Sequence, residues 1–446
     1  MAIKIGNISV NSVAIGSILV DSVAIGSNVV WEKTTPVVAS PLCFTANSAN
    51  STIKLNKNGN PSAISLETST DGTTWTDYGW TNKTGDTLTL TNIGDKVYIR
   101  AKTENSTIGS SFSNYYKFVG SGSLAASGNI QSMLKADCSR TDAPAYCFCY
   151  IFDGCSSLTQ APTLPATTLG NYCYYCMFRG CRTLATAPEL PATTLANSCY
   201  SGMFSQCWSL TQAPVLPATT LANNCYSNMF SGCDSLTQAP TLPATTLASN
   251  CYSSMFNGCN SLTQGPVLPA TTLASYCYSG MFQNCELLTQ APVLPATTLA
   301  QGCYSSMFEG CTLLETGPAL PVTTLAEFCY DGMFKDCTAL TQAPVLPATT
   351  LANNCYSSMF KGCTSLDTAP TLPATTLVDY CYNEMFTGCE ELDYIEVAFE
   401  AWYDDGMATD AWLHDSGMSG TFKCPSNLPQ EIDDSHIPMG WTVVTT

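Results

Sequence analysis

The sequence predicts an α/β repeat solenoid of 26-residue coils, preceded by an N-terminal β strip and a small β-sandwich. The first observation is a fixed period, because one leucine recurs every 26 residues with no insertion. A constant period of roughly 20–50 residues is typical of a solenoid, in which each unit buries its apolar face on its neighbours. The second observation is that the apolar spacing changes within a unit, which indicates a short helix and a short parallel strand in each coil. The recurring residues are Leu169, Leu195, Leu221, Leu247, Leu273, Leu299, Leu325, Leu351 and Leu377.

Composition along the chain predicts five segments. Residues 1–35 repeat short β-branched runs broken by glycine every ten residues, which indicates tight-turned strands that need a partner. We expect an N-terminal β-repeat anchor there, or alternatively the opening strands of the next domain. Residues 36–120 contain several short alternating runs, which are typical of a small Ig-like sandwich. We expect residues 121–157 to form the N-terminal cap of the array, residues 158–389 the solenoid, and residues 390–446 an acidic C-terminal cap.

Each 26-residue unit has two halves with different spacing. In one copy Leu221, Cys225 and Met229 lie four residues apart, which predicts one stripe of a short helix. The residue before the second cysteine, usually glycine, tolerates a left-handed backbone and is expected to end that helix. In the other half the apolar residues are three apart, and a proline removes one backbone donor from every coil. We therefore expect a parallel strand of only about two to four residues per coil.

Twenty of the 25 cysteines form two columns with the same period, from Cys147 to Cys381 and from Cys155 to Cys389. Neighbouring helical segments would lie about 8–10 Å apart, beyond the Cα separation of about 7 Å that a disulfide tolerates. We therefore expect buried free thiols that pack as small apolar side chains, with disulfides or a metal site as the alternatives. The only CxxC pair has no second pair at zinc-site spacing, so we expect no metal.

The charge and the motifs argue against several classes of function. A net charge of −18, with only 11% charged residues, argues against nucleic acid or an anionic membrane as the partner. Residues 390–446 carry twelve Asp or Glu and one Lys, without the spacing of a known cation loop, so we expect a solvated acidic cap, with a cation site as the alternative. The two histidines, His414 and His436, have no nucleophile-elbow motif beside them, and the sequence has no Gly-rich phosphate loop. We expect no enzyme activity and no cofactor.

The repeat resembles a known family. The pattern Cys-Tyr-x-x-Met-Phe-x-Gly-Cys-x-x-Leu is similar to the bacterial leucine-rich repeat of the BspA type, over about residues 147–392. Phe230, Cys233 and Leu236 match that family's pattern, whereas the 26-residue period and the proline column depart from it. The resemblance implies a leucine-rich-repeat-like solenoid. The Ile-Gly-Ser strip near the start and the closing segment that ends in Trp441 resemble virion proteins of tailed phages infecting gut Bacteroidales, which implies a fibre, capsid decoration or adhesin role.

Two sets of side chains are candidates for surface binding. A Thr-Gln column is expected to face solvent on the inner side, where repeated amides could bind a repetitive polymer such as a glycan; the alternative is that they only keep the array soluble. Aromatic residues at variable positions are the other candidates, since they are apolar rings on an otherwise polar face. The glutamines are Gln212, Gln238, Gln264, Gln290 and Gln342, and the aromatic candidates are Trp208, Tyr172, Tyr276, Phe328 and Tyr380.

These features together predict a non-enzymatic phage structural or adhesive protein. We expect residues 1–35 to bind other virion proteins, the solenoid to bind a host-surface glycan or protein, and the chain to act as a homo-oligomer or part of a larger assembly. The start lacks the pattern of a secretory signal peptide and no stretch approaches 18 apolar residues, so we expect synthesis in the host cytoplasm, assembly into the virion and no membrane insertion. The alternatives are a bacterial cell-surface adhesin with the same repeats and a polysaccharide-degrading virion enzyme.

Overall fold

The computed structural model describes residues 40–446 continuously and, before them, six short strands. The chain divides into two units, residues 1–40 and residues 41–446. The strands of the first unit form three antiparallel pairs, and the side chains that the predicted anchor at residues 1–35 would use lie outside the described residues. The pairs are β1 (Ile3–Ile5) with β2 (Ile8–Val10), β3 (Ala14–Ile15) with β4 (Ile18–Leu19), and β5 (Ser22–Ile25) with β6 (Asn28–Glu32).

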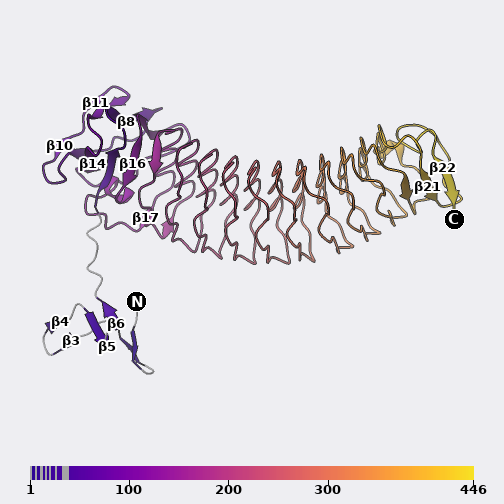
Figure 1. Ribbon diagram of the computed structural model, residues 1–446, viewed down its shortest axis with the longest axis horizontal. Helices are drawn as coiled ribbons and strands as arrows, with labels where there is room; N and C mark the ends of the chain where they lie inside the picture. Colours follow the sequence, from indigo (N-terminus) through magenta and orange to yellow (C-terminus); the bar gives the residue numbers. More distant parts are fainter. Residues whose placement is uncertain are drawn as a thin grey trace. The chain divides into compact units, whose positions relative to one another are not determined.

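The second unit begins with two β-sheets (Figure 1). One has the strand order β10-β9-β14-β7-β16-β18, and the other has the order β11-β12-β8-β13, with β15 also paired to β8. Leu42, Phe44, Leu55 and Phe118 are almost fully buried in the shared core. The strands are β7 (Leu42–Ala46), β8 (Ser51–Asn58), β9 (Leu66–Ser69), β10 (Thr76–Asp77), β11 (Trp80–Thr81), β12 (Thr84–Gly85), β13 (Leu88–Leu90), β14 (Lys96–Ala101), β15 (Tyr115–Ser121) and β16 (Leu124–Ser127).

The sheets continue into the array without a break in hydrogen bonding. Strand β16 pairs in parallel with β18, which belongs to the first coil, and the N–H of Phe118 donates to the carbonyl of Ile151. The coils that follow stack side by side from this end to the C-terminal end (Figure 1). The elements at the entry are η1 (Ile130–Met133), β17 (Asp142–Ala143), β18 (Leu158–Gln160) and β19 (Thr168–Leu169).

The short helix predicted for each coil is wrong. Residues 40–446 contain two short 3₁₀ helices and no α-helix, and none of the described helices is long and apolar enough to span a membrane. The segment from the recurring leucine to the second cysteine is instead a run of turns. In one copy Asn224, Asn228 and Gly232 have φ of 57°, 55° and 71°. A left-handed residue at every fourth position interrupts the helical backbone before a second turn can form.

The backbone N–H groups of this segment alternate between two kinds of partner. Those of Tyr226 and Phe230 donate to carbonyls of the next coil, at 3.0 and 2.9 Å. Those of Ser227 and Met229 donate to the carbonyl three residues back, which closes the turns. Every N–H group of residues 224–233 is therefore satisfied, and half of these groups bind one coil to the next. We call this half of each coil, residues 221–233 in this copy, the turn side.

The other half, residues 234–246 in this copy, is the Pro side, and its pairing is sparser than the predicted strand. Between β19 and β20, the inter-coil pairing on this side consists of isolated parallel bridges in place of continuous strands. The prolines remove donors, which explains why the bridges do not extend. The bridges lie in two columns, Thr186↔Gln212, Gln264↔Gln290 and Thr316↔Gln342 in one, and Thr194↔Thr220, Thr272↔Thr298 and Thr324↔Thr350 in the other.

The interior of the array is a set of columns of identical side chains. Tyr226 and Tyr252 stack at a centroid distance of 5.8 Å, as do Phe230 and Phe256, and the same stacking recurs through the array. The twenty cysteines of the two columns are buried free thiols, which confirms the expected burial. The thiol of the second cysteine has a recurring partner: Cys259 Sγ donates to the carbonyl of Phe230 at 3.1 Å. Thiols therefore fill the space beside the rings and satisfy a backbone acceptor.

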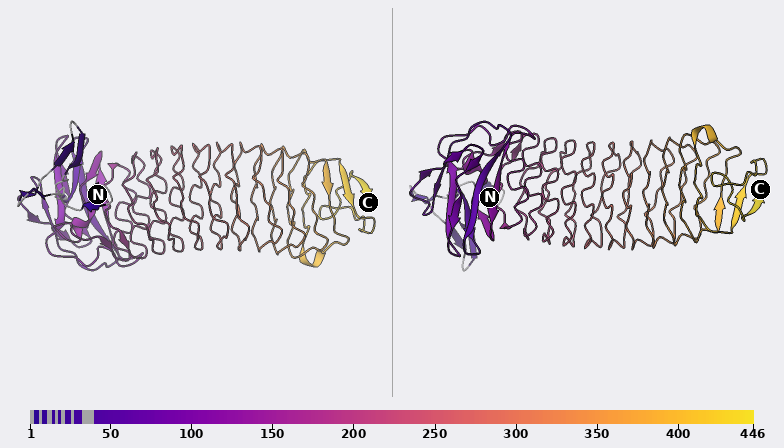
Figure 2. Two further views of the ribbon diagram at one scale, coloured as in Figure 1. Left: turned by 90° about the horizontal axis from the view of Figure 1, so that it is seen from below. Right: turned by 90° about the horizontal axis from the view of Figure 1, so that it is seen from above.

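The C-terminal cap continues the hydrogen bonding of the turn side past residue 389. The N–H groups of Phe386 and Gly388 donate to the carbonyls of Trp412 and His414, and the buried Trp412 covers the last aromatic rings. Its elements are β20 (Tyr394–Glu396), η2 (Asp404–Gly406), β21 (Thr421–Cys424) and β22 (Thr442–Thr445). Strands β20, β21 and β22 form a parallel sheet on one flank, with η2 on the opposite flank (Figure 2).

Candidate functional site

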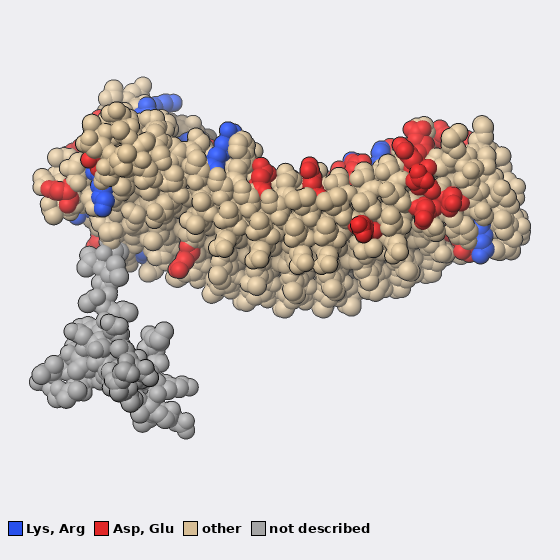
Figure 3. Space-filling model, viewed as in Figure 1, with Lys and Arg blue, Asp and Glu red and all other residues tan. Residues whose placement is uncertain are grey.

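Lys, Arg, Asp and Glu gather along the hollowed edge of the array, and the opposite edge is almost free of them (Figure 3). Along the array many of these charges are paired between coils. Arg179 contacts Asp153 at 2.7 Å, and Lys335 contacts Glu309 at 3.0 Å. Pairs of this kind neutralise one another and bind few ligands by charge alone.

The five predicted glutamines are exposed and form one column. Gln264 Nε2 donates to Gln290 Oε1 at 3.3 Å, so neighbouring amides contact each other. The column continues through Thr368, which bridges to Tyr394 at the start of β20. Since β20 lies on a flank of the array (Figure 2), the glutamines lie on that flank and not on the hollowed edge, where the sequence placed them. The five residues are Gln212, Gln238, Gln264, Gln290 and Gln342.

The predicted aromatic residues do not form one patch. Tyr172, Tyr276, Phe328 and Tyr380 occupy the same left-handed position of coils that are two or four repeats apart. The Tyr276 ring lies over Gly302 of the next coil, where the missing side chain leaves room for it. Trp208 follows the second cysteine of its coil and stacks under Arg182, whose guanidinium carbon lies 4.0 Å from the ring centroid.

One of these residues, Tyr172, belongs to an aromatic cluster that the sequence did not reveal. Phe112, on the loop before β15, lies 4.8 Å from Tyr172, 5.2 Å from Tyr146 and 5.0 Å from Tyr175 between ring centroids. Tyr146 and Tyr172 stack at 4.9 Å because they hold the same position in adjacent coils. Tyr150 then connects Tyr175 to Tyr115 on β15, at 5.4 and 4.8 Å. The aromatic cluster comprises Phe112, Tyr115, Tyr146, Tyr150, Tyr172 and Tyr175.

The cluster combines apolar faces with a polar border. Phe112 is 44% exposed, and the tyrosines are partly exposed. Burial raises the pKa of Tyr150, and the neighbouring Tyr175 and Cys176 raise it further, so its hydroxyl stays protonated. The Arg179 guanidinium lies 5.3 Å from the Tyr150 centroid and is fixed by Asp153. Rings of this kind give a ligand both a flat apolar surface and hydrogen-bonding groups.

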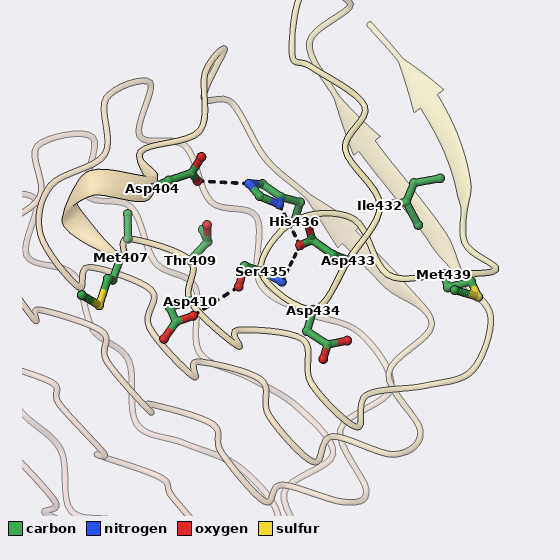
Figure 4. A pocket seen from close by; sticks show the side chains of 11 residues that line it. Asp404, Met407, Thr409, Asp410, Ile432, Asp433, Asp434, Ser435, His436 and Met439 are labelled. Carbon is green, nitrogen blue, oxygen red and sulfur yellow. Dashed lines mark hydrogen bonds and ion pairs between the residues drawn. The ribbon is translucent and has the colours of Figure 1, made fainter.

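A second site lies in the C-terminal cap, around a cavity of about 540 Å³ (Figure 4). His436 is at its wall, with Nδ1 2.7 Å from Asp433 Oδ1. Desolvation raises the pKa of Asp433, but hydrogen bonds from the Ser435 N–H and from His436 outweigh it and lower the pKa overall. In the part of the chain that the structure describes, one group of side chains could hold a metal ion, namely Asp404, Glu431 and His436. The sequence left a cation site here only as an alternative to a solvated acidic cap and named no ligands, because these residues are far apart along the chain.

Comparison with known proteins supports the repeat class. A family model described as the BspA type leucine rich repeat region matches in six copies, over residues 144–263, 197–341 and 304–401. No curated protein and no solved structure matches the chain. The family matches span residues 144–401, more than half of the 446 residues, and coincide with the stacked coils. This chain therefore belongs to the family of BspA type leucine-rich repeat proteins.

Proposed function

We propose that the chain is a non-enzymatic structural and adhesive protein of a phage virion, which presents its solenoid to a glycan or protein on the host surface. The family suggests a surface or adhesion-type repeat protein. The virion location is supported only by the resemblance of the two ends of the sequence to phage virion proteins. The observation that carries the binding role is the aromatic cluster at the start of the array.

The residue types of the cluster support a binding role. Tyr146, Tyr150 and Tyr172 all have φ between 57° and 59°, a left-handed conformation that recurs at these positions through the array. At the position of Tyr172 other coils carry residues that tolerate this conformation better, such as Asn224 and Asn250. Stacked tyrosines with bordering polar groups suit the apolar face and the hydroxyls of a sugar.

A glycan-array screen of the full chain tests the binding role. We expect a glycan ligand whose affinity falls about tenfold in Tyr172→Asn, which corresponds to about 1.4 kcal/mol. Asparagine fits this position because Asn224 and Asn250 have nearly the same φ. Phe328→Asn is the matched control, since Phe328 holds the same position as Tyr172, six or seven coils from the cluster members on the array, and should not affect binding. Equal loss in both variants, or no glycan bound by the native chain, would contradict a glycan site at the cluster.

The location and the lack of catalysis need separate tests. Mass spectrometry of purified virions and of host membrane fractions distinguishes the virion protein from a bacterial cell-surface adhesin, because the chain should be found in the virions.

Incubation of the protein with host capsular or wall polysaccharide distinguishes a non-enzymatic binding protein from a polysaccharide-degrading enzyme. We expect the polymer to keep its chain length, and shortened polymer would refute the non-enzymatic proposal.

A further inference from the structure

Three side chains of the C-terminal cap bring ligating atoms to one point. His436 Nε2 lies 3.1 Å from Asp404 Oδ1 and 3.4 Å from Glu431 Oε2. All three ligating atoms lie within 4.8 Å of one another. Two ligands on one metal ion, each bound at about 2.0–2.2 Å, are separated by about 3.0–3.5 Å in tetrahedral or octahedral geometry. The contacts of His436 Nε2 have this separation.

The second observation is the orientation of His436, whose side chain is only 9% exposed. Its Nδ1 faces Asp433 Oδ1 at 2.7 Å, while Trp402 packs on the ring at 4.8 Å. Asp433 accepts a hydrogen bond from Nδ1–H and so fixes the orientation of the ring. Nε2 is directed at Asp404 and Glu431, where a metal ion that displaces a proton from Nε2 would meet one imidazole nitrogen and two carboxylates. A carboxylate that fixes the far nitrogen of a ligating histidine is the usual second layer of a metal site.

A proton on Nε2 can satisfy this arrangement, and a divalent cation can replace that proton with all three side chains as ligands. The side chains of Asp404 and Glu431 are 68% and 55% exposed, so water can complete the coordination from the open side. Figure 4 shows Asp404 and His436 facing each other, with Asp433 on the other side of the imidazole ring. The net charge of −11 over residues 390–446 attracts cations to this end of the chain.

We propose that Asp404, Glu431 and His436 bind one divalent transition-metal ion, of the class of Mn²⁺ or Zn²⁺. One imidazole and two carboxylates suit these ions, whereas Mg²⁺ and Ca²⁺ prefer oxygen ligands alone. The ion joins η2 to the 431–436 loop and so closes the last coil, which has a neighbour on one side only. This site is independent of the proposed adhesion, because the aromatic cluster lies at the other end of the array.

Mn²⁺ titration of the full chain, after EDTA treatment and dialysis, tests the site. Free Mn²⁺ is measured by electron paramagnetic resonance, and Mn²⁺ is chosen because it binds thiols weakly. We expect one Mn²⁺ per chain, displaced by Zn²⁺ but not by an equal concentration of Mg²⁺. Asp404→Asn and Glu431→Gln each remove a ligand from an exposed position and should weaken binding at least tenfold.

Asp434→Asn is the matched control. Asp434 lines the same cavity and carries the same charge, but it contacts His414 at 3.1 Å and not His436. Binding in this variant should equal that of the native chain. Failure of the native chain to bind Mn²⁺ at millimolar concentration would overturn the proposal. So would full affinity in either ligand variant, or an equal loss in Asp434→Asn, which would indicate diffuse attraction by the acidic cap.

Discussion

The two sides of each coil differ in how they hold the stack together. On the turn side, Tyr278 and Phe282 are buried, and their N–H groups donate to the next coil at 3.1 and 2.9 Å. On the Pro side of the same coil, Val293 is 81% exposed, and the backbone forms isolated bridges only. Inter-coil hydrogen bonding is therefore concentrated in one half of the repeat, whereas both halves contribute buried side chains, such as Leu288 and Leu294 on the Pro side.

One exposed position of the Pro side varies between coils. Between neighbouring coils the Pro side leaves grooves of about 260–400 Å³, lined mainly by proline, leucine, alanine and the variable residue. That position holds Val215, Thr241, Val267 and Ala319 in different coils, whereas the buried columns of both sides hardly change. A substitution at the exposed position should therefore have little effect on stacking.

Truncation of a buried ring gives the largest expected contrast between the two sides. Phe282→Ala should lower the free energy of unfolding by about 3–5 kcal/mol, because it removes a fully buried ring that stacks on Phe256 and Phe308. Val293→Ala, in the same coil but on the Pro side, should change it by less than about 0.5 kcal/mol. Urea denaturation followed by circular dichroism measures both. Similar losses in the two variants would contradict the assignment of Phe282 to the buried core of the stack and of Val293 to an exposed position.

The rates at which cysteines on the turn side and on the Pro side react with a thiol reagent provide a second comparison of the two sides. Burial raises the pKa of Cys285 to about 12. About a thousandfold less thiolate is then present near pH 8 than for a thiol with the ordinary value of 9.0, before steric protection is counted. A cysteine introduced by Val293→Cys lies on the exposed Pro side and should react at the ordinary rate. Iodoacetamide labelling with peptide mass spectrometry compares the two rates, and rapid labelling of native Cys285 would show that the turn side opens.

The repeat and its interior could be predicted from the sequence, but the local backbone could not. The 26-residue period located each coil along the sequence, and the two cysteine columns indicated that free thiols are buried in the interior of the array. The spacing of Leu221, Cys225 and Met229 predicted a helix because four residues is close to the helical period of 3.6. The structure uses the same spacing for turns that repeat every four residues. Asn224 and Asn228, at positions that favour a left-handed backbone, were the signal that distinguished the two.

The candidate sites depend on contacts that the sequence does not encode locally. The glutamines were expected to be exposed from their place in the repeat, and they are. Phe112 is 60 residues before Tyr172, on a loop outside the repeat, so no period connects them. Asp404 and His436 are separated by 32 residues of irregular cap, and only the folded chain brings them to 3.1 Å. The 26-residue spacing of Tyr146 and Tyr172 was the one visible trace of the aromatic cluster.

Changes at the left-handed positions should alter stability by smaller amounts and in opposite directions. Gly258 has φ of 68° and space for a methyl group, so Gly258→Ala should destabilise by about 1 kcal/mol through the backbone alone. Gln206 holds the same position in another coil, with φ of 59°, so Gln206→Gly should stabilise by up to about 1 kcal/mol. Urea denaturation of both variants checks the signs. The same sign in both would contradict left-handed turns as the basis of the turn side.

The smallest expected effect concerns an acid on the turn side. Asp331 stands in a column that holds Ser305 and Ser357 in the adjacent coils, and burial raises the pKa of its carboxyl, with Glu309 adding to the shift. The unfolded chain therefore ionises this group more readily than the folded chain does. Stability is lost as pH rises from the ordinary carboxyl range through the raised pKa.

Asp331→Ser should remove that loss and make the protein slightly more stable near pH 7, while at pH 3 the difference from the native chain should be smaller. Thermal unfolding of both proteins across this pH range measures the difference. If the native chain is as stable as the variant at pH 7, or more stable, the cost of burying the Asp331 carboxylate is offset. The offsetting contacts are the hydrogen bond from Ser305 Oγ, at 3.4 Å, and the nearby Lys335. The turn side would then tolerate charge as readily as the Pro side does, and the contrast between the two halves would be one of packing alone.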